Sequence, residues 1–403
     1  MIKYWLVIMA ALGLAAAPTA QAQVSDGVIK IGVLTDMSSL YADLSGQGSV
    51  IAARMAVEDF GAAKKGMKVE IISADHQNKA DVGSGIARQW LDSDKVDVIV
   101  DTPNSAVALA VNQIVKEKGK AFLVSGAASS DLTGKACSPN TIHWTYDTWA
   151  LANGTGSAIV KTGGDTWFFL TSDYAFGHAL ERDTEAVVLK NGGKVLGKVR
   201  HPLNTADFSS FLLQAQSSKA KIIGLANAGG DTTNAIKQAA EFGIVKGGQS
   251  LAGLLVFITD VHALGLPTAQ GLIMTGAFYW DMNDKTRAFS KRFAELDRDI
   301  HPTMIHAGVY AATLHYLKAV EALKSDDGTK VIAKMKETPT DDPLFGKGTI
   351  RADGRKLHPM YLFEVKKPSE SKAPWDYYKL RATIPAEQAF RPIDQGDCPL
   401  VKK

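Results

Sequence analysis

Short apolar runs rich in branched residues alternate with amphipathic helical segments along most of the chain. In the first helical segment, Ile51, Met55, Val57 and Phe60 recur at helical spacing. Continuous apolar strands alternating with helices are typical of parallel sheets that helices cover on both faces. The alternation therefore predicts an α/β fold of the doubly wound kind. We expect strands at 29–36, 67–74, 96–101, 121–125, 166–172, 194–200, 221–226 and 272–280, and helices at 48–60, 82–91, 107–118, 180–190, 207–217 and 232–242.

The length of the chain predicts two such α/β lobes. The chain has 403 residues, whereas a single hydrophobic core stops growing at roughly 250 to 300 residues. The sequence Leu34-Thr-Asp followed by Tyr41 is echoed by Leu170-Thr-Ser-Asp followed by Tyr174, each time between an expected strand and helix. The repeat is weak and chance also produces matches of this length, but it favours two lobes built on the same plan.

No long linker separates the two halves of the sequence. Short polar and aromatic connections lie at 140–146, 277–281 and 345–349, and we expect them to be three hinge crossings between two doubly wound α/β lobes. Each lobe would then be assembled from discontinuous segments. The expected division is 23–143 plus 279–346 for the first lobe, 144–278 plus 347–390 for the second lobe, and 391–403 for a C-terminal tail.

The N-terminus has the features of a Sec-type signal peptide. Lys3 precedes an apolar run from Trp5 to Ala17, and the small residues Ala20 and Ala22 follow. A membrane anchor is the alternative, but it needs about 20 apolar residues and this run has 13. We expect residues 1–22 to be a signal peptide cleaved after Ala22, and the mature protein to reside in the periplasm.

Composition argues against several classes of partner. The chain carries 45 basic and 42 acidic residues, with no clustered stripe of Lys and Arg for nucleic acid or an anionic membrane surface. Export makes a disulfide between Cys137 and Cys398 possible, and two unpaired thiols are the alternative. No CxxC or paired Cys/His spacing is present, so we expect neither a metal nor another cofactor.

The sequence holds no motif for catalysis. Gly46-Gln-Gly48 lacks the third glycine of a dinucleotide-binding loop and lies well past its strand. A Walker loop and the HExxH and GxSxG motifs are absent. His301 and His306 are five residues apart, which does not suit two ligands on one helix face. We therefore expect a binding protein and not an enzyme.

Four segments in a fixed order resemble the leucine/isoleucine/valine-binding protein family. They are Ile31-Gly-Val-Leu-Thr-Asp36, Ala53-x-x-Ala56-Val-Glu-Asp59, Asp97-Val-Ile-Val-Asp-Thr-Pro-Asn-Ser105 and Phe122-Leu-Val-Ser-Gly-Ala-Ala-Ser129. Ser172-Asp-Tyr-Ala-Phe-Gly177 and Asp207-Phe-Ser-Ser-Phe211 continue the resemblance, which spans about 29–354. It implies a type I periplasmic binding fold whose two lobes close on a ligand. Open α/β sheets bind ligands beyond the carboxyl ends of their strands.

In the first lobe, Ser105, Ala128 and Ser129 are candidate ligand contacts. Ser105 lies between a strand and a helix, where its hydroxyl and neighbouring N–H groups could receive an anion. Ordinary helix capping explains Asn104 or Ser105 equally well. The resemblance implies that Ala128 presents a backbone carbonyl and Ser129 a hydroxyl to the ligand head group. A plain solvent loop is the alternative for that segment.

In the second lobe, the resemblance places an aromatic lid at Tyr174 and Phe176. Aromatic rings remove much area from water at small entropic cost, although either ring could instead belong to the core. Tyr41 occupies the position equivalent to Tyr174 in the repeat, and Asn227 follows the expected strand at 221–226. Tyr279, at the second crossing, could line the same cleft or pack in the hinge.

Two departures from the family pattern concern the cargo. The chain reads Gly253-Leu-Leu255 where amino-acid binders place an acid, and Ala226-Asn-Ala-Gly-Gly-Asp231 replaces an aromatic-rich loop. An unpaired buried ammonium costs several kcal/mol. We therefore expect an aromatic or other small carboxylate without an α-amino group, unless Asp231 supplies the acid.

The expected function is capture of this organic acid for an inner-membrane ABC permease. A branched-chain or other amino acid is the alternative cargo, and a ligand-sensing partner of a signalling system is the alternative role. We expect a monomer.

Overall fold

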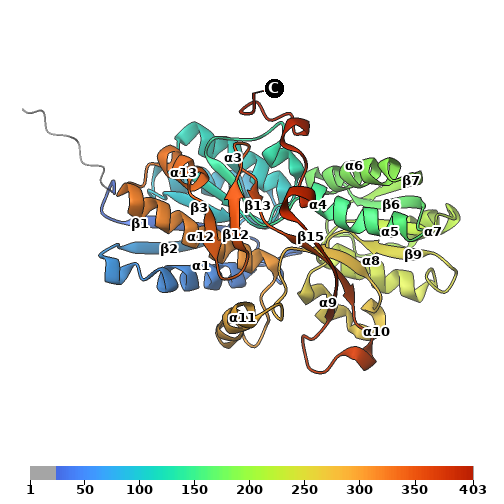
Figure 1. The fold of residues 1–403 in the computed structure, drawn as a ribbon. Coiled ribbons are helices and arrows are strands. Elements are labelled where there is room, and N and C mark those ends of the chain that lie inside the picture. The colour runs from blue at the N-terminus through green and yellow to red at the C-terminus, as the bar shows by residue number, and fades with distance from the viewer. Residues whose placement is uncertain (1–23, 403) are drawn as a thin grey trace, which may run out of the picture.

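Two parallel sheets, one in each half of the molecule, form the frame of the protein. A computed structural model describes residues 24–402, so the expected signal peptide at 1–22 lies outside the described residues. The first sheet has the strand order β2-β1-β3-β4-β5, and every neighbouring pair is parallel (Figure 1). Its strands are β1 (Ile29–Thr35), β2 (Val69–Asp75), β3 (Val98–Asp101), β4 (Ala121–Val124) and β5 (Thr141–His143).

The second sheet repeats the beginning of this topology. Its order is β7-β6-β8-β9, again with parallel neighbours only. In each sheet the first strand of the chain lies between the next two strands, so both sheets reverse their strand order beside their first strand. The strands are β6 (Thr166–Ser172), β7 (Lys194–His201), β8 (Ile222–Ala226) and β9 (Ser250–Gly253).

Helices cover both faces of each sheet because neighbouring strand residues point to opposite sides. In β3, Val98 and Val100 pack into one core with α1 and α12, whereas Ile99 packs into another with α2 and α3. The second sheet is covered in the same way, by α6 on one face and by α7 and α8 on the other. These helices are α1 (Gly46–Phe60), α2 (Ala80–Asp92), α3 (Ser105–Lys118), α6 (Ala175–Lys190), α7 (Ser209–Ser217), α8 (Gly230–Glu241) and α12 (Met304–Leu323).

The prediction of two doubly wound α/β layers is confirmed, and each expected strand overlaps an observed one. The last expected strand, 272–280, is shorter than predicted: β10 (Ile273–Gly276) ends at Gly276. The apolar residues that follow it carry the chain back toward the first sheet, where α11 (Asp284–Leu296), α12 and α13 (Gly328–Glu337) lie in sequence (Figure 1).

The third crossing lies later in the chain than expected at 345–349. That segment overlaps β12 (Gly346–Ile350), which pairs with β11 (Thr340–Asp342) and β13 (Lys356–Leu357). A bridge joins His143 at the end of β5 to Arg355. The hairpin therefore stays beside the first sheet, and the chain leaves it only between β13 and β14 (Met360–Val365). β14 then pairs with β10 and with β15 (Tyr378–Ile384).

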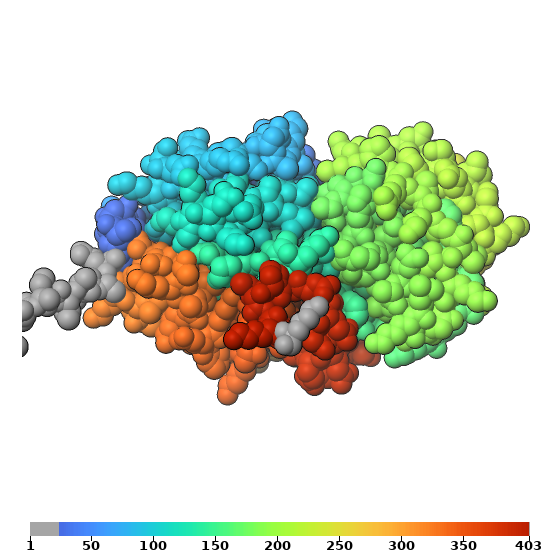
Figure 2. All heavy atoms as spheres, turned by 90° about the horizontal axis from the view of Figure 1, so that it is seen from above, coloured from blue at the N-terminus to red at the C-terminus, as the bar shows by residue number. Residues whose placement is uncertain are grey.

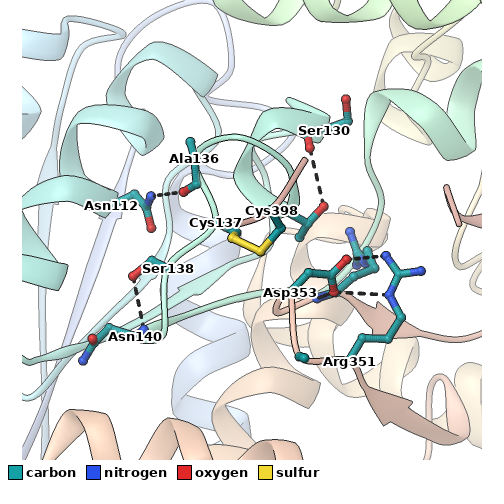
Figure 3. The surroundings of a disulfide bond; sticks show 12 residues. Asn112, Ser130, Ala136, Cys137, Ser138, Asn140, Arg351, Asp353 and Cys398 are labelled. Atoms are coloured by element: carbon teal, nitrogen blue, oxygen red, sulfur yellow. Dashed lines mark hydrogen bonds and ion pairs between the residues drawn. A yellow bond between two sulfur atoms is a disulfide. The ribbon is translucent and has the colours of Figure 1, made fainter. Parts of the chain in front are cut away.

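The C-terminal tail is tied to the first lobe by a disulfide bond. Cys137 and Cys398 are bonded, with their Cα atoms 5.6 Å apart and a separation of 261 positions in the sequence (Figure 3). Arg391 also donates to the backbone carbonyl of Ser130 at 3.0 Å. The last residues, shown in red in Figure 2, lie where the first lobe meets the second.

Among residues 24–402, none of the helices is both long enough and apolar enough to span a bilayer.

Candidate ligand-binding site

The loops after seven parallel strands, four from the first sheet and three from the second, meet around one cavity between the lobes. The first sheet contributes the loops after β1, β3, β4 and β5, and the second sheet those after β6, β8 and β9. These are the carboxyl ends of the strands, where open α/β sheets bind ligands. The lining residues are Tyr41, Leu44, Pro103, Gly126, Ala128, Tyr146, Tyr174, Phe176, Ala228, Leu255 and Phe257.

The cavity is small. Its volume is about 10 Å³, close to the lower limit for one water molecule, whereas sites for drug-sized ligands are typically about 300 to 1,000 Å³. Gly126 makes close packing possible, since a Cβ atom there would approach the Pro103 Cα to 2.7 Å and an Asp101 oxygen to 2.9 Å. The two lobes are therefore packed closely against each other at this site.

A pair of phenols joins the two lobes across the cavity. The hydroxyl oxygens of Tyr41, after β1, and Tyr174, after β6, lie 2.5 Å apart. Burial raises the pKa of both phenols above the usual range, so both stay neutral at ordinary pH. The Tyr174 ring lies 5.9 Å from that of Phe176. The expected ring pair of the second lobe thus lines the cavity, and so does Tyr41.

The cavity wall has no charged side chain among its described lining residues. Leu255 belongs to the segment where amino-acid binders of this family place an acid. Asp231, the other candidate acid, accepts the backbone N–H groups of Asn204 at 3.1 Å and Thr205 at 2.8 Å. Burial raises the pKa of Asp231 to about 6. Its carboxylate is therefore engaged by backbone in the second lobe and does not line the cavity.

The serine hydroxyls expected to bind the ligand face other protein groups. Ser105 Oγ accepts the N–H of Ser129 at 3.2 Å, and Ser129 Oγ accepts the N–H of Asp131 at 3.4 Å. Asn104, not Ser105, caps α3 by accepting the N–H groups of Ala106 and Val107. Both serines are buried beside the cavity without lining it, so the structure gives them an internal role in shaping the loop.

Ala128 does line the cavity, but its carbonyl accepts the N–H of Thr148 at 2.8 Å. In residues 24–402, no protein acceptor pairs with the backbone N–H groups of Gly126 or Ala128. The same short segment therefore offers two buried amide donors next to the cavity.

Asn227 and Tyr279 are not in the wall of the cavity. Asn227 is fully buried and hydrogen-bonded to His201 at 3.1 Å and Thr232 at 2.7 Å. Tyr279 donates to the carbonyl of Trp375 and accepts the N–H of Tyr377, each at 3.2 Å. Its ring lines a separate apolar cavity near the second crossing, together with Met304 and Phe363.

Sequence reasoning missed Tyr146, whose hydroxyl donates to the Gly126 carbonyl at 2.6 Å. Its ring lies 6.2 Å from that of Phe257, in an edge-on arrangement. Four other lining residues follow expected strands and could have been selected by that position, whereas Tyr146, Leu255 and Phe257 follow β5 and β9, which the sequence analysis does not predict. The missed lining residues are Leu44, Pro103, Gly126, Tyr146, Ala228, Leu255 and Phe257.

One buried acid lies directly behind the cavity wall. Asp101 ends β3, with φ 77° in the left-handed region. Its carboxyl oxygens make no hydrogen bond of good geometry within the described chain, although the hydroxyls of Ser49 and Thr35 lie close enough to oppose the effect of burial in part. Burial raises the pKa of Asp101 to about 7. Such a carboxyl is largely neutral below pH 7, so it does not repel an anion in the cavity there.

Comparison with known proteins places this architecture in a family. The family described as periplasmic binding protein matches residues 28–372. A Leu/Ile/Val-binding protein homolog 6 of Brucella melitensis is 25% identical over 355 residues, covering 85% of this chain and 89% of its own.

Two solved structures are similar to this chain over most of its length. A periplasmic binding protein from Burkholderia mallei has 55% identity and a TM-score of 0.91, covering 93% of this chain and 100% of its own. A branched chain amino acid ABC transporter periplasmic ligand-binding protein from Burkholderia xenovorans has 42% identity and a TM-score of 0.82, with 92% and 99% covered.

A solute binding protein of an ABC transporter from R. palustris, in complex with benzoate, has 23% identity and a TM-score of 0.80, with 89% and 97% covered. At that identity the likeness concerns the fold. The chain belongs to the leucine/isoleucine/valine-binding-protein-like family of periplasmic binding proteins, which are ligand-binding components of ABC transporters.

Proposed function

We propose that this protein captures a small carboxylate without an α-amino group, best an aromatic acid, and delivers it to an inner-membrane ABC permease. One observation carries the proposal: the cavity between the lobes combines aromatic rings and unpaired amides with no charged side chain in its described wall.

The carboxylate end of the ligand would lie at the amides of Gly126 and Ala128. A buried amide without an acceptor is costly to leave unpaired, so an anionic oxygen there stabilises the complex. Neutral donors also let the anion leave again, because they strand no opposite charge in the empty site. Release is necessary because the protein must deliver its ligand to the permease.

The rest of the ligand would pack among the rings of Tyr174, Phe176 and Phe257. Aromatic pairs prefer offset or edge-on contacts and contribute beyond the area they bury. A flat ring also needs the two lobes to separate less than a long or branched polar molecule would.

An amino acid fits this cavity less well. Its ammonium would meet Leu255 and Ala228 in the second lobe, and Asp231 is engaged by the backbone of Asn204 and Thr205. An unpaired buried ammonium costs several kcal/mol. Affinity for leucine should therefore be weak.

Branched-chain amino-acid binding is the second candidate. The Burkholderia xenovorans protein named for that ligand class shares 42% of its residues with this chain. The R. palustris protein in complex with benzoate supports the first candidate only through the shared fold, which in that protein accommodates an aromatic acid.

Binding would proceed by hinge closure, as in other periplasmic binding proteins. The open protein receives the ligand on the first lobe, and closure brings Tyr174 against Tyr41. We propose that the mature chain begins after Ala22, acts as a monomer and docks in its closed form on the permease.

Isothermal titration of the purified mature protein tests the proposal. Benzoate and 4-hydroxybenzoate should bind at least about tenfold more tightly than leucine, isoleucine or valine, which corresponds to about 1.4 kcal/mol. Benzylamine, which carries the ring without the carboxylate, serves as the control and should not bind. Tight leucine binding together with undetectable benzoate binding would establish the second candidate instead.

A further inference from the structure

Side chains of the third crossing between the lobes contact successive residues of the first crossing. Residues 144–147 follow β5, and residues 355–358 include β13 and lead toward β14. We call these two segments the crossing pair. Lys356 Nζ lies 5.4 Å from the ring centre of Trp144, and His358 Nε2 is 2.7 Å from the carbonyl oxygen of Thr145.

Arg355 makes the remaining contacts of the crossing pair. Its Nη1 donates to the Tyr146 carbonyl at 3.1 Å and lies 3.6 Å from an Asp147 carboxylate oxygen. Asp147 in turn accepts the N–H of Ala150 and so caps the short helix α4 (Thr148–Leu151). One guanidinium therefore holds both the backbone of the first crossing and the start of the next helix.

This guanidinium is completely buried. Arg355 has no exposed surface, and the guanidinium lies 4.6 Å from the ring centre of Phe390. Burying an ion pair costs desolvation energy that its attraction offsets only with good geometry, and an apolar pair of similar volume is often as stable. Stability alone therefore does not account for an arginine at this position.

Tyr146 connects this arginine to the cavity. Its carbonyl receives Arg355, its ring lines the cavity, and its hydroxyl holds the carbonyl of Gly126. Gly126 belongs to the loop at 125–129, which carries the two unpaired amides; we call it the ligand loop. The contacts thus run from the third crossing through Tyr146 to the ligand loop, while Arg355 itself does not touch the cavity.

We propose that Arg355 is a positioning residue of the ligand site: it fixes Tyr146 against the ligand loop and thereby makes ligand affinity depend on the geometry of the crossing pair. The inference rests on the proposed function only in requiring that the cavity take a small-molecule ligand.

Three variants separate this role from simple stabilisation. Arg355→Lys keeps the charge but loses the planar guanidinium, whose Nη1 reaches Tyr146 and Asp147 while its Nε donates to the Lys356 carbonyl. Tyr146→Phe keeps the ring and removes only the bond to Gly126. Arg351→Lys is the control, because the Arg351 side chain pairs with Asp353 and donates to the Arg391 carbonyl at 2.8 Å without touching residues 144–147. Arg351 also donates its backbone N–H to the Arg355 carbonyl, and the substitution keeps that backbone bond.

Hydrogen exchange of the ligand-free variants, measured by mass spectrometry, gives a readout that needs no ligand. Arg355→Lys should raise exchange at least about threefold in peptides covering both 124–130 and 144–148. Tyr146→Phe should do so in 124–130 alone, and Arg351→Lys in neither. Unchanged exchange in 124–130 for both Arg355→Lys and Tyr146→Phe would overturn the proposal.

Titration with benzoate and leucine gives the second readout. For whichever probe the wild type binds, Arg355→Lys should weaken affinity about tenfold and Tyr146→Phe about threefold, with Arg351→Lys within twofold. Equal losses of ligand affinity in Arg355→Lys and Arg351→Lys would overturn the proposal. Failure of the wild type to bind either probe contradicts the proposed ligand classes and leaves the exchange experiment decisive. If Arg355→Lys does not fold, Tyr146→Phe decides both readouts.

Discussion

The hydroxyl oxygens of Tyr41 and Tyr174 lie 2.5 Å apart, and they belong to the loops after the first strand of each sheet. The two residues occupy equivalent places in the repeated topology. Their contact can exist only while the lobes are together, because each hydroxyl is carried by a different lobe. It is therefore a direct marker of closure.

Replacing Tyr174 by Phe should weaken closure while leaving its ring in the cavity wall. A hydrogen bond of this kind contributes about 0.5–1.5 kcal/mol, so ligand affinity should fall about two- to tenfold. Small-angle scattering of the ligand-free protein should show a larger radius of gyration. The control is Tyr377→Phe, whose hydroxyl bonds to His262 within the second lobe; an equal effect there would contradict the assignment.

Introducing an acid at Leu255 should change the ligand class. In Leu255→Glu the carboxylate would repel a bound organic acid and offer a partner to an ammonium. Benzoate affinity should fall at least about tenfold, ~1.4 kcal/mol, and leucine affinity should rise relative to it, as measured by titration calorimetry. Leu213→Glu, at a residue 63% exposed, is the control. Unchanged benzoate affinity in Leu255→Glu would show that the ligand binds elsewhere.

Removing the disulfide should lower stability without abolishing binding. The double variant Cys137→Ser with Cys398→Ser should lose about 2–5 kcal/mol of unfolding free energy, since the bond closes a long loop in the unfolded chain. Urea denaturation with and without a reducing agent measures this loss. Reduced wild type should match the variant, and equal stability of oxidised wild type and variant would contradict the prediction.

Asp101 should make stability depend on pH in a defined direction. Its pKa is raised to about 7 in the folded protein, so the folded state binds the proton more tightly than the unfolded state. The contribution of Asp101 to stability is therefore lost progressively as pH rises from about 4 to 7.

The variant Asp101→Asn has no carboxyl to ionise. Its stability relative to wild type should therefore improve by about 2–3 kcal/mol between pH 5 and pH 8. Denaturant unfolding at both pH values measures the difference between the two proteins, so other titrating groups cancel. A constant difference would mean that Asp101 titrates near its usual pKa.

Much of the fold could be predicted from the sequence because the burial pattern is local. Strands such as β6 and β8 are continuous apolar runs, and Tyr41, Tyr174, Phe176 and Ala128 could be selected because they lie where such runs end. The same reasoning chose Ser105 and Ser129, but it could not tell that their polar atoms are used inside the loop.

Tyr146 could not be predicted from its neighbours in the sequence. Its position depends on Arg355, which is 209 residues away, and on a strand register that only the folded chain establishes. The contact between Tyr146 and Arg355 leaves no local pattern. The segment 345–349 has a different explanation: its two glycines are typical of a connection, but pairing with the nearby Thr340–Asp342 and Lys356–Leu357 makes most of it a strand.

The bond between Cys137 and Cys398 also imposes an order on biosynthesis. Its second thiol is synthesised 261 positions after the first. The first lobe can therefore acquire its covalent tie only after the strands of the second sheet have been made. A chain that stopped before Cys398 would lack that tie however well its first sheet had formed.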